Sequence, residues 1–249
     1  MQRIPTNHPR YRSLVTREKI SQAMKDGIVH ETGLIAHGRG EAFDYLIGET
    51  TIPLADNAEK IAAASLLCAK KPIISVNGNV AALASDECIS LAKTIPAALE
   101  VNLFHRTSER VKKIATLLQK KGVETLYGVH PDARIPGLDS DRALCEKVGI
   151  YSADVVLVPL EDGDRCQALM RMGKTVIAID LNPLSRTAQS ASITIVDNVT
   201  RAIPRIEYWV EVLKGTKPSQ FEKLMKTWDN QKNLEKTMCF LSKRLNSLS

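Results

Sequence analysis

Apolar and polar residues follow two different periods along this chain of 249 residues. Between Lys71 and Lys214, short apolar runs typical of buried strands alternate with segments in which apolar residues recur at helical spacing. The runs are PIISVNGN, ALEVNLF, VETLYGV, ADVVLVPL, TVIAID and ASITIVD, and the predicted helices cover 80–95, 108–121, 165–172 and 199–214. Strands and helices that alternate on this scale favour an α/β fold with a mainly parallel, doubly wound sheet and right-handed crossovers.

Helical patterns flank this region at both ends of the chain. Apolar positions predict a first helix over 10–25 that ends before Gly27, and an Ala-rich helix over 55–70. The Gly-rich stretch GLIAHGRGEAFDYLIGE between them is expected to be a loop. Beyond Lys217 one long amphipathic helix is expected, packed on the sheet or on a second subunit. We expect a single domain with an N-terminal part over 1–70, a sheet core over 71–215 and a C-terminal helix over 216–249.

The polar segment from His130 to Ile150 is too long for a simple connection between a strand and a helix. It is either an excursion over a functional site or a surface decoration, and we favour the excursion.

Composition places the chain among soluble globular proteins, because 44% of its residues are hydrophobic and 25% are charged. No apolar run approaches the roughly 20 residues that cross a bilayer, and the first residues lack the apolar stretch of a signal peptide, so we expect a cytoplasmic protein. The five cysteines are scattered, odd in number and never in CxxC spacing, which argues against a structural zinc site.

Positive charge exceeds negative charge by 34 − 28 = +6, which suits either nucleic acid or small polyanions such as nucleotides. Only 4% of the residues are aromatic, so the stacking platforms of single-strand binders are scarce.

Polar residues follow several of the predicted strands, where open parallel sheets bind ligands. Asn77, Gly78 and Asn79 follow the first strand, and the glycine there would permit a positive φ and close backbone approach to a phosphate or carboxylate. An ordinary tight turn is an equally good interpretation, since neither GxGxxG nor GxxxxGK[ST] is present.

A second polar cluster follows the run TVIAID. Asp180 at the tip of this strand is suited to accept hydrogen bonds from ribose hydroxyls, and the Asn182 amide to pair with a base edge. Asn198 precedes the next predicted helix and is first of all a capping residue. Together the segment from Asp180 to Val199, which includes Leu181, Arg186 and Thr187, suggests a nucleotide pocket.

The N-terminal part is rich in arginine and histidine. Arg10, Arg12 and Arg17 lie on or near the first helix, and His37 and Arg39 lie among glycines. An arginine fork matches phosphate and carboxylate oxygens, whereas an exposed arginine is ordinarily only solvated. A lone histidine is more often structural than catalytic, and no HExxH or paired-ligand spacing supports zinc.

Long and unusual strings in this sequence resemble those of the archaeal phosphopantothenate synthetases, also called 4-phosphopantoate–β-alanine ligases. The strings are IPTNHPRYRSLVTREKI, GLIAHGRGEAFDYLIGE, KPIISVNGNVAAL, LEVNLFHRTSERV, GVHPDARIPGLDSDR and IAIDLNPLSRTAQSASITIVDNVTRA. The resemblance covers nearly the whole chain and fades after Gly215.

This resemblance implies a Rossmann-like homodimer that uses ATP and Mg²⁺. The ATP contacts that it implies map to Arg17, Arg39, Asp180, Leu181, Asn182, Arg186, Thr187, Asn198 and Val199. It assigns no residue to the metal.

The implied reaction joins 4-phosphopantoate to β-alanine through an acyl-adenylate. The acid site is predicted at Asn77, Gly78 and Asn79, with Arg10, His130 and Arg134 as further candidates. Arg39, His37 and Asn77 are the residues predicted to take part in catalysis. A nicotinamide-dependent oxidoreductase is the alternative, weakened by the missing glycine fingerprint, and a nucleic-acid-binding module is a third possibility.

Overall fold

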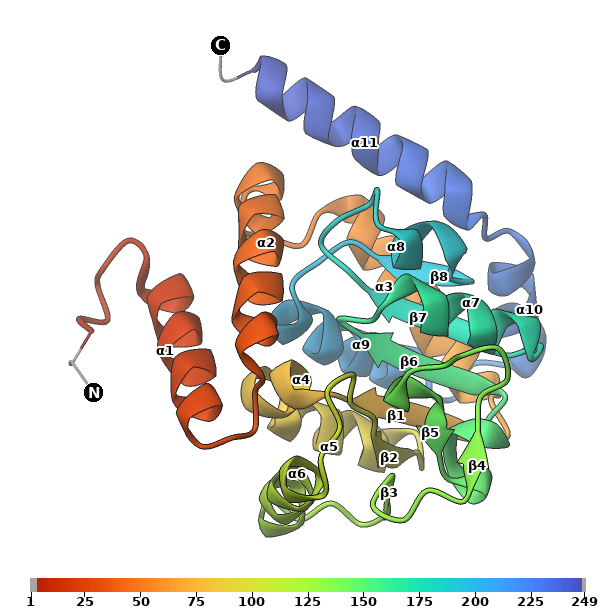
Figure 1. Cartoon of the computed structure of the whole chain (residues 1–249). Coiled ribbons are helices and arrows are strands. Elements are labelled where there is room, and N and C mark those ends of the chain that lie inside the picture. Colours follow the sequence, from red (N-terminus) through yellow and green to blue (C-terminus); the bar gives the residue numbers. More distant parts are fainter. Residues whose placement is uncertain (1–3, 248–249) are drawn as a thin grey trace.

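The computed structural model describes residues 4–247 and folds them around a six-stranded sheet (Figure 1). All strands of this sheet run parallel, in the order β3-β2-β1-β6-β7-β8. Their bounds are β1 Pro72–Val76, β2 Ala98–Val101, β3 Leu126–Tyr127, β6 Val155–Pro159, β7 Thr175–Ile179 and β8 Ile193–Ile195. The predicted parallel, doubly wound sheet is therefore confirmed.

The order of the strands defines a crevice at the centre of the sheet. The chain lays down β1, β2 and β3 toward one edge, returns to place β6 on the other side of β1, and continues with β7 and β8. Ile73 of β1 is accordingly paired with Ala98 of β2 and with Val156 of β6. The loops after β1 and β6 leave in opposite directions, which opens the crevice in which doubly wound folds bind ligands.

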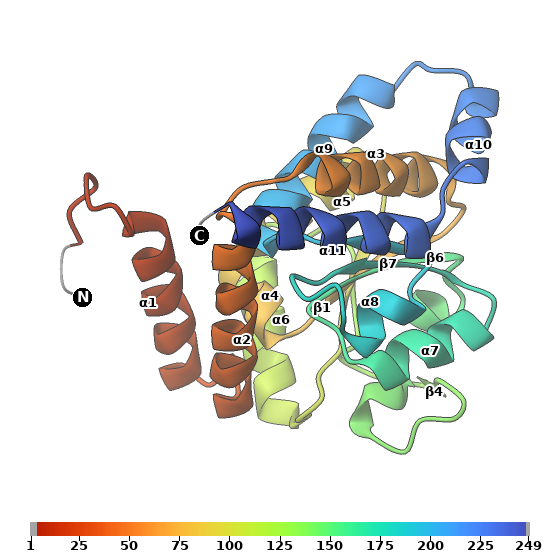
Figure 2. The same cartoon turned by 90° about the horizontal axis from the view of Figure 1, so that it is seen from above.

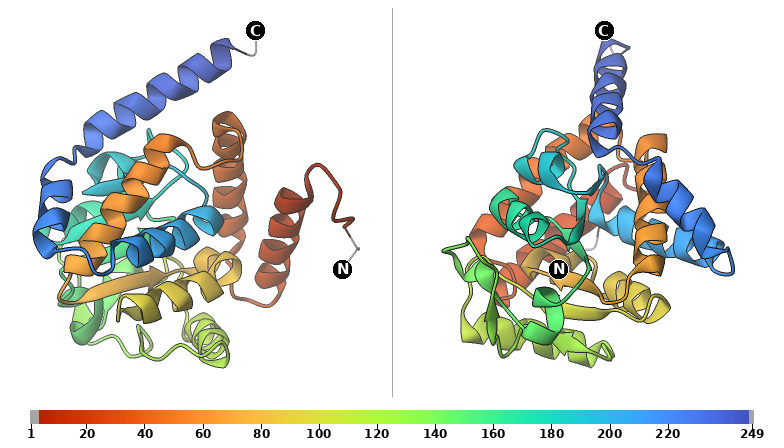
Figure 3. Two further views of the ribbon diagram at one scale, coloured as in Figure 1. Left: turned by 180° about the vertical axis from the view of Figure 1, so that it is seen from behind. Right: turned by 90° about the vertical axis from the view of Figure 1, so that its right-hand side faces the viewer.

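Helices cover both faces of the sheet, as Figure 2 and Figure 3 show from other sides. Their bounds are α1 Tyr11–Lys25, α2 Glu31–Ile47, α3 Pro53–Cys68, α4 Gly78–Leu83, α5 Ser85–Thr94, α6 Ser108–Lys120, α7 Gly163–Arg171, α8 Arg186–Ser190, α9 Val199–Leu213, α10 Pro218–Lys226 and α11 Asn230–Asn246. Successive strand residues point to opposite faces, so Ile74 packs in the core that includes α3, α5 and α9, while Ile73 packs in the core that includes α7.

The Gly-rich stretch after Gly27 is a helix, so the prediction of a loop there is wrong. His30 caps the amino end of α2 by accepting a hydrogen bond from the Thr32 amide, and Gly48, at φ 90°, ends the helix in the left-handed conformation. Glycine lowers helix stability by about 1 kcal/mol per residue, but packing overrides that preference here. The Asn79 amide donates to the carbonyl of Gly33 at 2.8 Å, and α2 lies across the carboxyl ends of the strands (Figure 1).

Two predicted helices are each divided in the structure. The helix behind β1 breaks at Ala84, whose φ of −143° is not helical, and becomes α4 and α5. The C-terminal helix breaks between α10 and α11, because the Trp228 indole donates to the carbonyl of Ser192 at 2.9 Å and Asp229 caps α11. Both breaks let the chain change direction while it follows the surface of the sheet.

The segment from His130 to Ile150 contains short elements of its own. These are β4 Ala133–Arg134, paired antiparallel with β5 Leu144–Cys145, the 3₁₀ turn Asp141–Ala143 and the π-turn Lys147–Tyr151. The buried Glu100 carboxylate holds this segment by accepting hydrogen bonds from the amides of Glu146 at 2.9 Å and Ile150 at 2.5 Å. The C-terminal end of the segment is thus fastened to β2.

Two glycines of α2 form a matched pair for testing why the helix carries them. A Cβ added at Gly33 would lie 2.4 Å from Asn79 Oδ1 and 2.9 Å from Val29 Cγ1, whereas one added at Gly38 would meet nothing within 4 Å. We expect Gly38→Ala to stabilise the chain by about 1 kcal/mol through helix propensity. We expect Gly33→Ala to destabilise it by roughly 1–3 kcal/mol through overpacking.

Urea unfolding of the two variants beside the unsubstituted chain measures both free energies. Equal effects of the two substitutions would contradict the close packing of α2 on Asn79.

Candidate functional site

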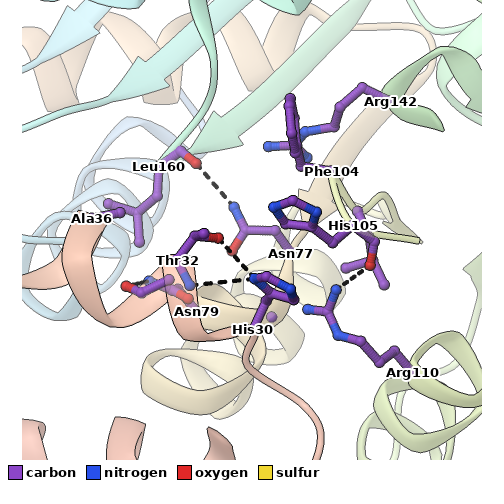
Figure 4. A pocket seen from close by; sticks show the side chains of 13 residues that line it. His30, Thr32, Ala36, Asn77, Asn79, Phe104, His105, Arg110, Arg142 and Leu160 are labelled. Carbon is purple, nitrogen blue, oxygen red and sulfur yellow. Dashed lines mark hydrogen bonds between the residues drawn. The ribbon is translucent and has the colours of Figure 1, made fainter. Parts of the chain in front are cut away.

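The first cavity lies at the carboxyl ends of β1 and β2, under the amino end of α2 (Figure 4). Its volume is about 160 Å³. It is lined by His30, Thr32, Gly33, Ala36, Asn77, Gly78, Asn79, Leu103, Phe104, His105, Arg110, Arg142 and Leu160. The lining contains two arginines and two histidines but no carboxylate, so the first cavity attracts anions.

Arg110 supplies the least compensated charge of the first cavity. Its guanidinium donates to two backbone carbonyls, that of Ile28 at 3.0 Å and that of His105, and its Nε is buried without a partner within residues 4–247. Burial lowers the pKa of Arg110 because the charge has lost solvation, and no carboxylate pairs with it within residues 4–247. A bound phosphate or carboxylate would restore that lost stabilisation.

Two stacked histidines lie beside Arg110. The rings of His30 and His105 are 3.8 Å apart between centroids and inclined by 19°. Burial, followed by the charges of His30 and Arg110, lowers the pKa of His105. An anion in the first cavity would reverse this effect by favouring the protonated ring.

Arg142 reaches the first cavity from the segment that follows β3. It donates to the carbonyl of Asn102 at 2.8 Å and pairs with Glu161 at 3.1 Å and Asp162 at 3.0 Å. Glu161 is also paired with the buried Arg165. Since two carboxylates already neutralise the two arginines, Arg142 serves mainly as a fixed wall.

The turn after β1 is used largely by the fold itself. The Asn77 amide donates to the carbonyls of Pro159 at 3.1 Å and Leu160 at 3.0 Å, and its oxygen accepts from the Val80 amide at 3.0 Å. Gly78 does not have the positive φ that we expected, since its backbone lies within α4. Glycine is needed there because a Cβ would lie 2.5 Å from the carbonyl oxygen of Ile28.

A second cavity of about 50 Å³ continues from the first along α2. It is lined by Ala36, His37, Gly40, Glu41, Asn79, Leu83, Leu160, Leu181, Asn198 and Val199. Ala36, Asn79 and Leu160 line both cavities, so the two adjoin. The structure thus brings three of the predicted nucleotide residues, Leu181, Asn198 and Val199, beside the predicted turn after β1.

A third cavity of about 220 Å³ lies between α1, α2 and the start of α9. It is lined by Arg12, Ser13, Thr16, His37, Glu41, Asp44, Glu49, Asn198, Thr200 and Arg201. His37, Glu41 and Asn198 also line the second cavity. Its lining carries both signs of charge, unlike that of the first cavity.

The turn after β7 is held together by its own polar groups. Asp180 accepts hydrogen bonds from the Asn182 amide at 2.9 Å and from the Ser185 hydroxyl, and the Asn182 side chain accepts from the Leu184 amide at 2.9 Å. Burial raises the pKa of Asp180, while these hydrogen bonds and the charge of Arg39 act in the opposite direction. Arg39 therefore lies within electrostatic reach of the turn.

The other predicted nucleotide residues lie apart from one another. Arg17 pairs with Glu41 at 2.9 Å and donates to the Tyr45 hydroxyl at 3.3 Å. Arg39 is exposed on the other flank of α2, with no hydrogen bond or ion pair within the described residues. Arg186 pairs with Asp164 on the surface.

The buried Thr187 hydroxyl donates to the carbonyl of Glu161 at 2.9 Å, so it is occupied within the fold.

Three predicted substrate residues lie outside the cavities described above. Arg10 is exposed before α1 and donates to the Tyr45 hydroxyl at 3.3 Å. His130 and Arg134 are exposed in the segment that follows β3, and Arg134 donates to the carbonyl of Leu138 at 3.5 Å. Sequence reasoning instead missed Arg110, although it follows the strand ALEV in the string HRTSER and could have been found by the same strand-end argument.

Two observations concern metals and membranes. Within residues 4–247 no group of three or more histidine, cysteine, aspartate or glutamate side chains is arranged to hold a metal ion. None of the described helices has the length and apolar character that a membrane span requires.

A buried acid pair supports the turn that precedes α9. Glu59 of α3 is fully buried, neither of its carboxyl oxygens has a hydrogen-bond donor within residues 4–247, and Arg205 Nε lies 4.0 Å away. Burial first, and then the neighbouring Asp197 and Asp56, raise the pKa of Glu59 to about 9. Asp197 in turn accepts from the Asn198 amide at 2.7 Å, and Asn198 lines the second cavity, so Asp197 connects Glu59 to the wall of that cavity.

Comparison with known proteins gives a consistent result. A family model described as "Phosphopantothenate/pantothenate synthetase" matches residues 54–244. A protein named 4-phosphopantoate–beta-alanine ligase from Thermococcus onnurineus is 52% identical over 250 residues, which cover 100% of this chain and 96% of that protein. Proteins of the same name from Methanosarcina mazei and Methanospirillum hungatei are 50% and 59% identical, over 99% and 82% of this chain and 97% and 83% of their own lengths.

The buried acid pair predicts a pH-dependent stability. Folded chains keep the Glu59 proton up to about pH 9, whereas unfolded chains lose it near pH 4.3. Between these values the unfolded state binds fewer protons, so the free energy of unfolding falls as pH rises, by at most about 1.4 kcal/mol per pH unit. We expect Glu59→Gln to remove this loss. The free energy of unfolding of the variant, relative to that of the unsubstituted chain, should therefore rise steadily from pH 5 to pH 9.

Urea unfolding at each pH measures this difference, and Glu109→Gln is the control. The pKa of Glu109 is lowered by its hydrogen bond to Lys113, so its carboxyl group stays ionised over this range. A Glu59→Gln difference that does not change with pH would contradict a proton on Glu59.

Proposed function

This chain belongs to the phosphopantothenate/pantothenate synthetase family, and on that premise we propose that it joins 4-phosphopantoate to β-alanine at the expense of ATP. The products are 4′-phosphopantothenate, AMP and pyrophosphate, and the reaction serves coenzyme A biosynthesis. The comparisons give no support to a nicotinamide-dependent oxidoreductase. The substrates are soluble metabolites, so we place the reaction in the cytoplasm.

The chemistry requires activation of the acid before the amide bond forms. A carboxylate is a poor acylating agent, because an oxide ion is a poor leaving group. Transfer of AMP onto the carboxylate supplies a better one, and pyrophosphate leaves in that step. The enzyme must hold two polyanions together, so offsetting their repulsion is its first task.

One observation carries this proposal. The first cavity contains the uncompensated charge of Arg110, and it adjoins the second cavity, which is lined by Leu181 of the turn after β7. We place the phosphate group of 4-phosphopantoate against Arg110, with His30 and His105 at the rim. Its carboxylate then points toward Asn79, where the first and second cavities adjoin. In this arrangement Asn77 and Gly78 act by shaping the wall rather than by binding the acid, since their polar groups are used in the fold.

We place ATP across α2. The adenosine lies by Leu181, Asn198 and Val199, with the turn from Asp180 to Asn182 and Arg39 at its outer end. A further cavity of about 480 Å³ lies between α1 and α2 and holds Arg17. His37 and Glu41 line both this cavity and the second cavity, so a phosphate chain that passes them next meets Arg17. Arg39 and Arg17 would thus contact the two ends of one extended nucleotide.

Arg186 and Thr187 support this nucleotide site from behind. Arg186 is bound to Asp164 on the surface, and Thr187 fastens the turn after β7 to the carbonyl of Glu161. We assign Thr187 a positioning role, and we place Arg186 at the solvent-exposed edge of the nucleotide site. The homodimer implied by the family resemblance belongs to this proposal as well.

Magnesium is assigned to the ATP complex rather than to a cage on the chain. Within residues 4–247 no group of three metal-ligating side chains exists, and Mg²⁺ commonly keeps several waters while it binds substrate phosphates. It would supply charge neutralisation on those phosphates.

The direct test incubates the purified protein with ATP, Mg²⁺, 4-phosphopantoate and β-alanine, and then omits each component in turn. We expect AMP to form only when all four are present, and pyrophosphate exchange into ATP to require the acid but not the amine. Hydride transfer with a nicotinamide cofactor, or turnover without ATP, would exclude this function.

Arg110→Met tests the position of the phosphate, because methionine removes the charge while retaining an apolar stem. We expect KM for 4-phosphopantoate to rise about tenfold to a hundredfold, which corresponds to the loss of a charged hydrogen bond of roughly 1.5–3 kcal/mol. Turnover of unphosphorylated pantoate should change far less, so that discrimination between the acids falls.

Arg134→Met is the matched control, since Arg134 is exposed outside the cavities. If Arg134→Met raises KM and Arg110→Met does not, the acid lies at the segment that follows β3 instead.

A further inference from the structure

His37 lies where three cavities meet. It lines the second cavity, the third cavity and the cavity that holds Arg17. Its side chain is half-buried, and neither ring nitrogen is hydrogen-bonded within residues 4–247. An imidazole with free nitrogens at such a junction is available to exchange a proton with a ligand.

The third cavity differs from the first in the charges that it presents. Carboxylates of Glu41, Asp44 and Glu49 line it together with the guanidinium groups of Arg12 and Arg201. Asp44 and Arg201 are paired with each other, and Glu41 is paired with Arg17 across the wall. A small zwitterion fits this mixed lining, whereas the cationic first cavity fits a dianion.

We propose that the third cavity binds β-alanine and that His37 accepts the proton that the ammonium group of β-alanine must lose before it attacks. This inference rests on the proposed function. The ammonium group faces Glu41, and the carboxylate faces Arg12 on α1, the arginine of this cavity that has no ion pair within the described residues. From there the nitrogen reaches the second cavity beside His37, where the acyl-adenylate is held.

Burial keeps the His37 ring neutral when the amine arrives. Burial lowers the pKa of His37 and the charge of Arg17 adds to this, while the carboxylates of Glu41 and Asp44 act in the opposite direction. Arg201 on α9 faces the same cavity but is held by Asp44. With the pKa below the ordinary value near 6.5, the ring is unprotonated at neutral pH and can accept a proton.

The step balances in atoms and charge. One proton of the ammonium group passes to His37, and the nitrogen lone pair forms the C–N bond at the acyl carbon. The bond from that carbon to the AMP oxygen breaks, and its electron pair leaves with AMP. The nitrogen loses a second proton to water, and His37 releases its proton to water. An acyl-adenylate and an ammonium ion thus give an amide, AMP and two protons.

The inference separates the two half-reactions, and His37→Gln tests it. Acid-dependent pyrophosphate exchange reports adenylate formation without the amine, and amide formation reports the second step. We expect the variant to lose about 10²–10⁴ in kcat/KM for β-alanine, the usual contribution of a positioned base, while exchange falls less than tenfold. The rise of kcat/KM for β-alanine with pH that reflects the pKa of His37 should disappear in the variant.

Hydroxylamine provides a rescue, because it is an amine that is largely unprotonated at neutral pH. We expect His37→Gln to form hydroxamate from the adenylate at a rate within tenfold of the unsubstituted enzyme. A structural role for His37 would lower hydroxamate formation and amide formation equally. His8→Gln, on the exposed N-terminal segment, is the control and should leave both steps unchanged.

Three outcomes overturn the inference. They are equal loss of both half-reactions in His37→Gln, equal loss with hydroxylamine and β-alanine, and full retention of amide formation. Absence of acid-dependent exchange in the unsubstituted enzyme would instead overturn the proposed function, so the two failures are distinguishable.

Discussion

The hydrogen bonds of the Asn77 side chain hold together the place on which the candidate site depends. β1 and β6 are neighbours in the sheet, but the segments that follow them diverge, and Leu160 takes a φ of 55° as the chain turns away. This divergence would leave the carbonyls of Pro159 and Leu160 without partners at the bottom of the crevice. The Asn77 amide donates to both, while its oxygen caps α4. The crevice is therefore open to ligands and yet fixed in width.

Charge is arranged along α2 in an order that matches the order of the proposed reaction. At the amino end of α2, Arg110 presents positive charge to the first cavity, whose lining contains no carboxylate. Farther along, Glu41 and Asp44 face the third cavity beside arginines that already hold them. A dianion is thus favoured at one end of the helix, and a small molecule that carries both signs of charge at the other. Because α2 carries the residues that separate these regions, one helix determines which substrate binds on which side.

The sequence predicted the sheet and several residues of its loops, but it did not predict α2. Apolar runs of buried strands are strong signals, and all six were identified in the right class of sheet. Three glycines made α2 look like a loop in the sequence. The helix is stabilised by contacts with Asn79 and with Asn198, the capping residue of α9, which are far away in the sequence. Arg110 follows a predicted strand and could have been identified, but only the structure shows that its guanidinium contacts the carbonyls of Ile28 and His105 rather than a carboxylate.

The space needed by the nucleotide bears on whether α2 moves when ATP binds. Ligand sites typically occupy about 300–1,000 Å³, and the cavity that holds Arg17 measures about 480 Å³, whereas the second cavity, in which the adenosine is placed, measures about 50 Å³. If ATP lies by Leu181 and Asn198, α2 has to move away from the carboxyl ends of the strands. Two of the contacts that would have to break or adapt are polar, Asn79 to the Gly33 carbonyl and Asp44 to the α9 cap, whereas Ile47 and Phe43 at the C-terminal end of α2 pack in an apolar cluster with Leu181 and Leu241. Polar contacts exchange with water or with ligand atoms at a small net cost, of roughly 0.5–1.5 kcal/mol each, so the two hydrogen bonds oppose a movement of α2 only weakly and the apolar cluster at its C-terminal end opposes it more.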